Sequence, residues 1–251
     1  MGVQGLRGRR TIVVIPCYNE SNRLDGEALL QYAASHPDIG FLLVDDGSTD
    51  STRDLLAGLS ERLPEAVAWE GLARNSGKAE AVRQGVLAAL TAQPDRVAYW
   101  DADLATPLRS LDKFLAAMDA NPALLGVFGC RVRRLGAAID RRPLRHYAGR
   151  IFATLASLTL GMAVYDTQCG AKLFRAGPEL ASAFSTPFLS PWIFDVEVLA
   201  RLRAAMAPSP LAPVLMELPL DEWEDVAGSK LTTSRGARAF LDLLLIARRY
   251  R

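Results

Sequence analysis

Short runs of apolar residues alternate with longer segments of helical periodicity through the first half of the chain. In the longer segments, such as 51–63 and 78–92, apolar residues recur about every three to four positions. Ser48, Asp50 or Ser51 can supply a capping oxygen at the start of the first of these helices. We expect strands over 11–16, 41–45, 66–70, 97–100 and 125–128. Uninterrupted apolar strands separated by helices indicate an α/β fold with a mostly parallel sheet and helices on both of its faces.

The second half of the chain is less regular, although two elements can be placed. We expect a helix over 192–205 and a strand over 214–220. The longest apolar run, 151–164, has 14 residues, and a membrane-spanning helix needs roughly 18–20. We therefore expect a protein that can lie on a membrane but does not cross one.

Composition excludes few classes of protein. The chain has 29 basic and 28 acidic residues, and its net charge of +1 gives no general attraction to nucleic acid. Cys17, Cys130 and Cys169 form no C-x-x-C pair, and only His36 and His146 could join them, so a structural zinc site is not expected. Reduced thiols, together with a first apolar run too short for a signal peptide, point to the cytoplasm.

Polar residues follow three of the expected strands at the points where the strands end. Ligands of an open parallel sheet bind outside the carboxyl ends of its strands, so these residues are the informative ones. They are Pro16-Cys17-Tyr18-Asn19-Glu20 after the first strand, Asp45-Asp46-Gly47-Ser48 after the second and Asp101-Ala102-Asp103 after the fourth. We expect the three strand ends to share one rim and to form a site there.

The glycine-rich loops of common nucleotide-binding proteins are missing. A dinucleotide site would need G-x-G-x-x-G after the first strand, where the turn reads C-Y-N-E-S. A P-loop would need a serine or threonine after Gly77-Lys78, but Ala79 follows, and Gly71 lies one residue too far upstream. The G-x-G-T-R type of loop found in sugar-nucleotide pyrophosphorylases is also missing.

Asp101 and Asp103 place two like charges one residue apart at the end of an expected strand. Hard divalent cations such as Mg²⁺ and Mn²⁺ prefer carboxylate oxygens and complete their shell with water and substrate phosphates. A metal in this position would neutralise a departing diphosphate. The alternative is a solvated turn in which Asp103 caps the following helix.

The chain resembles an inverting family-two glycosyltransferase of the GT-A (Rossmann-like) fold in four motifs: Pro16-x-Tyr18-Asn19-Glu20, Val44-Asp45-Asp46-Gly47-Ser48-Thr49-Asp50, Asn75-x-Gly77-Lys78 and Asp101-x-Asp103. Its second half is similar to the dolichyl-phosphate glucosyltransferase branch, related to the polyprenyl-phosphate mannose synthases, in D-T-Q-C-G-A-K-L-F (166–174), Trp192-x-Phe194-Asp195-x-Glu197 and 223–230. The resemblance implies a single domain over 1–251, with a nucleotide-binding half at 1–105, an acceptor-binding half at 106–235 and an amphipathic C-terminal helix at 236–251.

The resemblance also implies roles for individual residues. Asp101 and Asp103 would hold the sugar nucleotide and a divalent metal, Mg²⁺ or Mn²⁺. Mannose synthases often carry a glutamine where this chain has Ala105, so metal binding would depend mainly on Asp103, and UDP-glucose is favoured over GDP-mannose as the donor. Asp195 would bind a sugar hydroxyl or simply begin a helix. The other implied donor-site residues are Pro16, Tyr18, Asn19, Glu20, Asp45, Asp46, Asn75, Gly77, Lys78, Ala102, Lys172 and Lys230.

A basic stretch at 131–150 carries seven arginines and one acid, a local formal charge of +6. It could be a solvated loop, but arginine forks match phosphate oxygens, and the apolar run 151–164 follows directly. A basic patch beside apolar surface is typical of a protein bound to an anionic membrane. By family likeness, Arg131 and Arg150 would bind an acceptor phosphate. The C-terminal segment could add an interfacial contact or pack in the core, since it carries Phe240, Leu241, Leu244 and Leu245 beside Arg248, Arg249 and Arg251.

A phosphate acceptor is largely ionised at neutral pH and can attack the anomeric carbon without a strong base. We expect one in-line displacement that converts an α-linked donor into a β-linked polyprenyl phosphate sugar, with the metal and Lys230 offsetting charge on the diphosphate. The enzyme would lie on the cytoplasmic face of a membrane, and a separate integral-membrane partner could assist it.

Three alternatives to glucose transfer onto a lipid phosphate remain open. The donor could be GDP-mannose with the same acceptor. A hydroxyl acceptor would instead make Asp195 an essential base. A binding or scaffold protein without turnover is disfavoured by the intact set of Asp46, Asp101 and Asp103.

Overall fold

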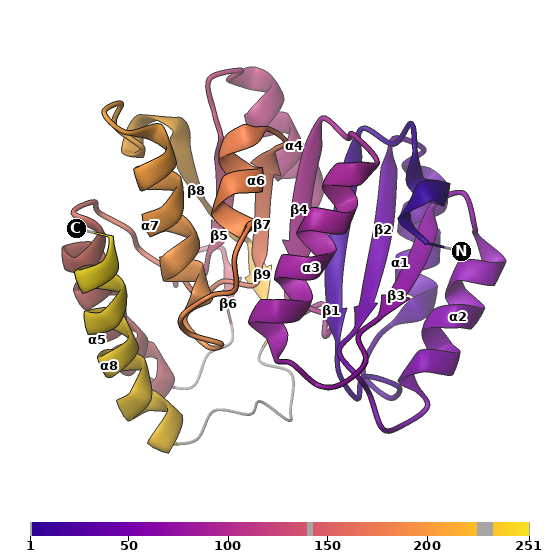
Figure 1. Cartoon of the computed structure of the whole chain (residues 1–251), viewed down its shortest axis with the longest axis horizontal. Coiled ribbons are helices and arrows are strands. Elements are labelled where there is room, and N and C mark those ends of the chain that lie inside the picture. The colour runs from indigo at the N-terminus through magenta and orange to yellow at the C-terminus, as the bar shows by residue number, and fades with distance from the viewer. Residues whose placement is uncertain (1, 140–142, 225–232, 251) are drawn as a thin grey trace.

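A seven-stranded sheet forms the centre of the molecule (Figure 1). The computed structural model describes residues 2–139, 143–224 and 233–250. The strand order is β3-β2-β1-β4-β7-β5-β8. The strands are β1 (Thr11–Cys17), β2 (Ile39–Asp45), β3 (Val67–Gly71), β4 (Arg96–Trp100), β5 (Gly126–Cys130), β7 (Ala171–Arg175) and β8 (Leu215–Pro219). Two short strands, β6 (Ala138–Ile139) and β9 (Glu222–Trp223), pair with each other in parallel beside it.

The sheet is mostly parallel, as the apolar runs predicted, and the expected strands are present with ends shifted by one or two residues. The exception is β7, which pairs antiparallel with both β4 and β5. No strand was expected there because Lys172 stands in the middle of it. The ammonium of Lys172 is nevertheless buried, and its ion partner lies on a helix that comes later in the chain.

Helices cover both faces of the sheet. They are α1 (Gly26–Ser35), α2 (Thr52–Arg62), α3 (Lys78–Thr91), α4 (Ser110–Ala120), α5 (Pro143–Leu160), α6 (Pro178–Phe184), α7 (Phe194–Met206) and α8 (Thr233–Arg249), with 3-10 turns η1 (Val3–Leu6) and η2 (Ala212–Val214). Successive strand residues point to opposite faces. Accordingly Val14 and Tyr99 pack with α3, α6 and α7, whereas Val13 and Ala98 pack with α1, α2 and α4.

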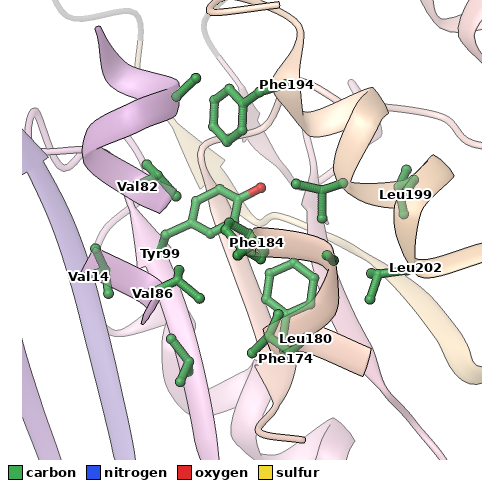
Figure 2. Packing of buried hydrophobic residues seen from close by; sticks show 14 of the residues in the cluster. Val14, Val82, Val86, Tyr99, Phe174, Leu180, Phe184, Phe194, Leu199 and Leu202 are labelled. Carbon is green, nitrogen blue, oxygen red and sulfur yellow. The ribbon is translucent and has the colours of Figure 1, made fainter. Parts of the chain in front are cut away.

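Aromatic side chains fill the core on the α3–α6–α7 face (Figure 2). Tyr99 of β4 lies between Phe174 of β7 and Phe194 of α7, with ring centroids 5.8 and 5.9 Å apart. Phe184 of α6 meets Phe174 edge to face at 6.3 Å. These contacts join the two halves of the chain in one core, which fixes β4 relative to α7.

The capping oxygen of α2 comes from one of the three residues that the sequence offered. Asp50 Oδ1 accepts hydrogen bonds from the backbone N–H and the hydroxyl of Thr52, at 3.0 and 2.6 Å. Ser51 occupies the N-cap position without a side-chain bond to the helix. The side chain of Ser48 binds Asn19 instead.

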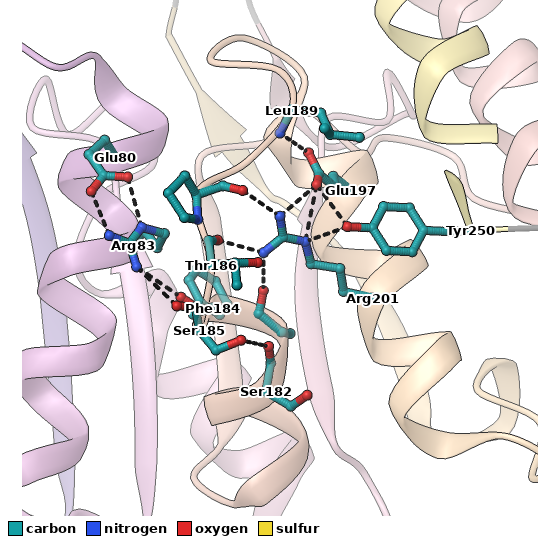
Figure 3. A network of polar contacts seen from close by, with 12 residues as sticks. Glu80, Arg83, Ser182, Phe184, Ser185, Thr186, Leu189, Glu197, Arg201 and Tyr250 are labelled. Carbon is teal, nitrogen blue, oxygen red and sulfur yellow. Dashed lines mark hydrogen bonds and ion pairs between the residues drawn. The ribbon is translucent and has the colours of Figure 1, made fainter. Parts of the chain in front are cut away.

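A buried polar network ties the loop before α7 to the end of the chain (Figure 3). Glu197 accepts from Arg201 at 2.7 Å, from the hydroxyl of Tyr250 at 3.1 Å and from the backbone N–H of Leu189 at 2.7 Å. Arg201 also donates to the carbonyl oxygens of Ala183, Thr186 and Pro187. Because every charge in the network is matched, a buried ion pair is tolerated here.

Helix α8 packs in the core on one side, which was one of the two roles considered for the C-terminal segment. One side packs inward through Ala239, Leu243 and Ile246, and the buried Asp242 accepts a hydrogen bond from Ser190 at 2.6 Å. The opposite side exposes large apolar residues: Phe240, Leu241, Leu244 and Leu245. None of the described helices combines the length and apolarity that crossing a bilayer requires.

Candidate active site

The carboxyl ends of β1, β2 and β4 lie side by side, so the polar residues that follow these strands are brought together. The loop after β1 is bound to the loop after β2. Asn19 donates its backbone N–H to Ser48 Oγ at 3.0 Å, and Glu20 donates its own to Thr52 Oγ1 at 2.7 Å. Pro16 is accommodated because β4 pairs with β1 only as far as Val14.

Asp46 organises the loop that precedes α3. Its two oxygens accept the backbone N–H groups of Ser76 and Gly77 at 2.7 and 2.8 Å. Burial raises the pKa of Asp46, although these two hydrogen bonds oppose the shift. Gly47 has a φ of +66°, and a Cβ there would lie 2.5 Å from the nitrogen of Asn75. The two loops can therefore touch only because this residue is glycine.

Asp45, the last residue of β2, lies at the same edge of the sheet. It is fully buried, and its Oδ1 accepts the backbone N–H of Ser48 at 3.0 Å. Its Oδ2 pairs with Arg53 of α2 at 3.1 Å. Asp45 thus shapes the turn, while the side chain of Asn75 is exposed beside it.

Asp101 and Asp103 lie in a tight turn that follows β4. Leu104 donates its backbone N–H to the carbonyl of Asp101 at 3.1 Å, and Ala105 donates its own to Asp103 Oδ1 at 3.2 Å. Leu104 has a φ of +48°, a conformation that costs a non-glycine residue roughly 1–2 kcal/mol. The following helix, α4, begins only at Ser110 with Arg109 as its N-cap. Asp103 therefore caps this turn and not the helix.

Each of the two aspartates is paired with a cation. Lys78 Nζ lies 2.5 Å from Asp101 Oδ1. Arg23 Nη2 donates to Asp103 Oδ2 at 3.1 Å, and its Nη1 donates to Glu20 Oε1 at 3.3 Å. Burial lowers the pKa of Lys78, but the carboxylates of Asp101, Asp195 and Asp103 together raise it by more. Burial and the charge of Asp101 raise the pKa of Asp103. The structure thus resolves the like-charge repulsion with two internal cations.

Arg23 was not among the residues singled out from the sequence. It comes three residues after Glu20 in a loop, and Asp103 lies 80 residues further along. Only the fold brings the two together.

A buried ion pair joins β7 to α7. Lys172 of β7 is 1% exposed and donates to Asp195 Oδ1 at 2.6 Å and to the carbonyl of Cys169 at 2.5 Å. The hydroxyl of Tyr99 donates to the same oxygen of Asp195 at 2.6 Å. Burial and the adjacent carboxylate raise the pKa of Tyr99 well above its ordinary value. Asp195 lies in the first turn of α7, so it is both near the helix start and locked in the core.

Two arginines were expected to bind an acceptor phosphate. Arg131 directly follows β5, which lies on the other side of β7 from β4, and Arg150 lies in α5. Arg131 makes a two-pronged pair with Asp166, at 2.7 and 2.8 Å, which raises the pKa of the guanidinium despite its burial. Arg150 stacks on the ring of Tyr165 at 3.8 Å and donates to its carbonyl at 3.2 Å. A cavity of about 30 Å³ lies beside Arg150, lined by parts of 149–153 and 165–168. Lys230 and residues 141–142 fall outside the described residues.

An open groove of about 1060 Å³ begins at Asp103. It runs between α1 and the β6–β9 pair, and its walls include Tyr32, Leu108, Ile139 and Trp223. In the described part of the chain, no three Asp, Glu, His or Cys side chains form a complete metal site. The oxygens of Asp101 and Asp103 fit a hard divalent cation whose remaining ligands are phosphates and water.

A sequence profile for the family described as Glycosyl transferase family 2 matches residues 12–179, which include every strand-end motif described above. The chain belongs to glycosyl transferase family 2. The family expected from its motifs is therefore confirmed, and the matched residues include the loops after β1, β2 and β4.

Relatives of this family 2 enzyme cover nearly all of it. A dolichyl-phosphate beta-glucosyltransferase of Trichomonas vaginalis (ALG5C) is 29% identical over 94% of this chain and 70% of its own length. The dolichyl-phosphate beta-glucosyltransferase of Saccharomyces cerevisiae is 29% identical over 95% of this chain and 74% of its own.

A solved structure shares the fold. Glucosyl-3-phosphoglycerate synthase from Mycobacterium tuberculosis, in complex with Mn²⁺, UDP-glucose and phosphoglyceric acid, matches with a TM-score of 0.67 at 18% identity. The match covers 96% of this chain and 80% of that protein. At this identity the likeness concerns the fold alone, and it agrees with the GT-A architecture expected from the sequence.

Proposed function

We propose that this enzyme transfers glucose from UDP-glucose to a polyprenyl phosphate of the dolichyl type, inverting the anomeric centre to give a β-linked lipid phosphate sugar. The relatives named dolichyl-phosphate beta-glucosyltransferase support this, because the similarity spans 94–95% of the chain and so includes the acceptor half. We also propose that 1–105 bind the nucleotide and 106–235 the acceptor. The amphipathic helix expected over 236–251 is α8, which spans Thr233–Arg249.

The contacts of Asp195 are the observation that favours a phosphate acceptor over a hydroxyl acceptor. A hydroxyl acceptor needs a general base within reach, and Asp195 was the candidate. Its Oδ1 already accepts from both Tyr99 and Lys172, and its side chain is 8% exposed. A carboxylate held in this way is a poor base for a bulky acceptor. A phosphate monoester needs none, because it is ionised at neutral pH.

A divalent cation, Mg²⁺ or Mn²⁺, would be held by Asp103 and Asp101 together with the donor diphosphate. Bound there, it would stabilise the charge that develops on the leaving diphosphate. The residues of this chain do the rest. Asp46 holds the 75–77 loop against the nucleoside, and Lys78 supplies a fixed positive charge beside Asp101.

Acceptor binding is assigned to the region of Arg131 and Arg150. Arg150 can offer its guanidinium to a phosphate, since the contacts it makes within the described residues are with the ring and the carbonyl of Tyr165. Arg131 is committed to Asp166 and would act by shaping the pocket or by exchanging partners. This differs from the equal roles expected of the two arginines from sequence.

We propose that the enzyme sits on the cytoplasmic face of its membrane through α5 and α8, which pack against each other. Two large apolar side chains of α5, Ile151 and Leu158, are exposed. Helix α8 adds four more and ends on Arg248 and Arg249. Apolar surface next to arginine suits an anionic interface. The three cysteines are unpaired thiols, which suits a reducing compartment.

The deciding experiment measures transfer of label from UDP-[¹⁴C]glucose, with GDP-[¹⁴C]mannose in parallel, to a short polyprenyl phosphate with and without Mn²⁺ or Mg²⁺. We expect metal-dependent label in the lipid phase from UDP-glucose alone. Asp103→Ala should abolish it, and Asp95→Asn, at the opposite end of the sheet, should not. Label from GDP-mannose would move the enzyme to the mannose branch. Release of UDP with no lipid product would redirect the search to hydroxyl acceptors.

A further inference from the structure

Both oxygens of Asp103 are engaged by groups of this chain. Oδ1 accepts the backbone N–H of Ala105 at 3.2 Å, and Oδ2 accepts Arg23 Nη2 at 3.1 Å. The carboxylate on which metal binding is expected to depend most therefore already has a cation beside it. Any metal that binds to Oδ2 must compete with the guanidinium of Arg23.

Arg23 is held more firmly than an ordinary surface arginine. Its side chain is 26% exposed, and it bridges Asp103 in the turn after β4 to Glu20 in the loop after β1. Glu20 and Asp103 are 11% and 23% exposed, so both ion pairs are partly shielded from solvent. Pairs of this kind are stronger than fully exposed ones, which contribute little.

The guanidinium is not fully used in this arrangement. Its Nε is buried and has no hydrogen-bond partner among the described residues. A guanidinium is planar and can donate N–H groups to two oxygens of one phosphate. The carboxylate of Asp103 accepts only from Nη2, so the Nε–H is left without an acceptor. The side chain is therefore suited to exchange Asp103 for a phosphate.

We propose that Arg23 competes with the divalent cation for Asp103, and that the nucleotide diphosphate removes this competition by offering its own oxygens to the guanidinium. This inference rests on the proposed function, because it takes a nucleoside diphosphate as the ligand of the site. It makes Arg23 a positioning residue that couples metal binding to nucleotide binding. The metal enters with the nucleotide, since alone it has to displace an internal cation.

Two opposite effects are expected when Arg23 is replaced. In Arg23→Gln, Asp103 loses its competitor, and Mn²⁺ in the absence of nucleotide should bind about tenfold more tightly, the equivalent of one charge-assisted hydrogen bond. In the same variant the diphosphate loses a guanidinium partner, so UDP at saturating Mn²⁺ should bind about tenfold more weakly. Loss of a positive charge at a distance would move both affinities in these same directions but only weakly, because salt screens it, so an arginine far from the site is needed as the control.

The test measures Mn²⁺ binding from the electron paramagnetic resonance signal of free Mn²⁺, and UDP and GDP binding by calorimetry at saturating Mn²⁺. Arg10→Gln is the matched control, because it removes an arginine paired with Asp95 at the other end of the sheet. Unchanged Mn²⁺ affinity in Arg23→Gln, or a shift of both affinities in the same direction, would overturn the proposal.

Arg23→Lys separates pairing from charge. A lysine keeps the positive charge but lacks the fork that reaches Glu20 and Asp103 together, so we expect it to shift both affinities in the same directions as glutamine. Wild-type values in Arg23→Lys would also overturn the proposal. None of these measurements uses a lipid acceptor or sugar transfer, so they can be interpreted even if the proposed function fails.

Discussion

Gly170 leaves room for the carboxylate of Asp101. A Cβ at Gly170 would lie 1.9 Å from Asp101 Oδ2 and 2.4 Å from Oδ1. The backbone of Gly170 also accepts the N–H of Asp101 at 3.0 Å, so neither residue can move away from the other without breaking the end of the β4–β7 ladder. The segment 166–174 thus fixes where the first aspartate of the turn points.

Gly170→Ala is therefore expected to displace the Asp101 carboxylate. A shift of about 1 Å in a binding group can lower turnover about 100-fold, and we expect a loss of that size in glucose transfer. Circular dichroism and urea unfolding should show a folded protein, less stable by about 1–3 kcal/mol because of overpacking. Gly58→Ala is the control, because a Cβ there meets nothing within 4 Å. Wild-type transfer by Gly170→Ala would contradict the assignment.

Lys172 and Asp195 stabilise the fold as a pair. Lys172→Met leaves the carboxylate of Asp195 buried beside Tyr99 without its direct ion partner, and should cost about 3–5 kcal/mol in the free energy of unfolding. The double variant Lys172→Met/Asp195→Asn should recover much of that loss, because an amide oxygen can still accept from Tyr99. Urea unfolding checks both.

An exposed pair gives the comparison for this measurement. Arg10 and Asp95 are 59% and 54% exposed, so Arg10→Met should change stability by no more than about 1 kcal/mol. Equal losses in Lys172→Met and Arg10→Met would mean that the buried pair has no special role.

The cap of α2 should make stability depend on pH. Hydrogen bonds from Thr52 and Ser21 lower the pKa of Asp50 to about 2. Because the folded value lies below the unfolded one of about 3.9, the unfolded chain binds more protons between these values. The contribution is present in full above about pH 5 and is lost as the pH falls toward 2. The stability difference between wild type and Asp50→Asn, measured by urea unfolding, should shrink over that window. A constant difference would rule out the charge of Asp50 as the cause.

The exposed side of α8 should govern membrane binding. Leu241→Glu/Leu244→Glu places two carboxylates where apolar side chains are 63% and 68% exposed, and should reduce cosedimentation with anionic vesicles at least tenfold. Gln4→Glu, an exposed change in η1 at the other end of the molecule, is the control. Equal vesicle binding by all three proteins would place the membrane contact elsewhere.

The sequence allowed β1, β2 and β4 to be predicted because each is an apolar run that ends in polar residues, and parallel strands place those ends together. It could not reveal β7. Lys172 interrupts the apolar pattern, and its burial is understandable only with Asp195, 23 residues later. Arg23 was missed for the same reason, since its partner Asp103 lies 80 residues away in the sequence and no local pattern predicts the ion pair.

The position of β7 in the sheet has a consequence for how the chain folds as it is made. β4 ends at residue 100, but its outer edge is covered only by β7, which begins at residue 171. At a synthesis rate of about 5–20 residues per second, that edge stays open for roughly 4–14 s on the ribosome. An open edge beside fully buried strands is a template for pairing with other chains. The early strands should therefore depend on chaperones, and a chain cut before residue 171 should aggregate.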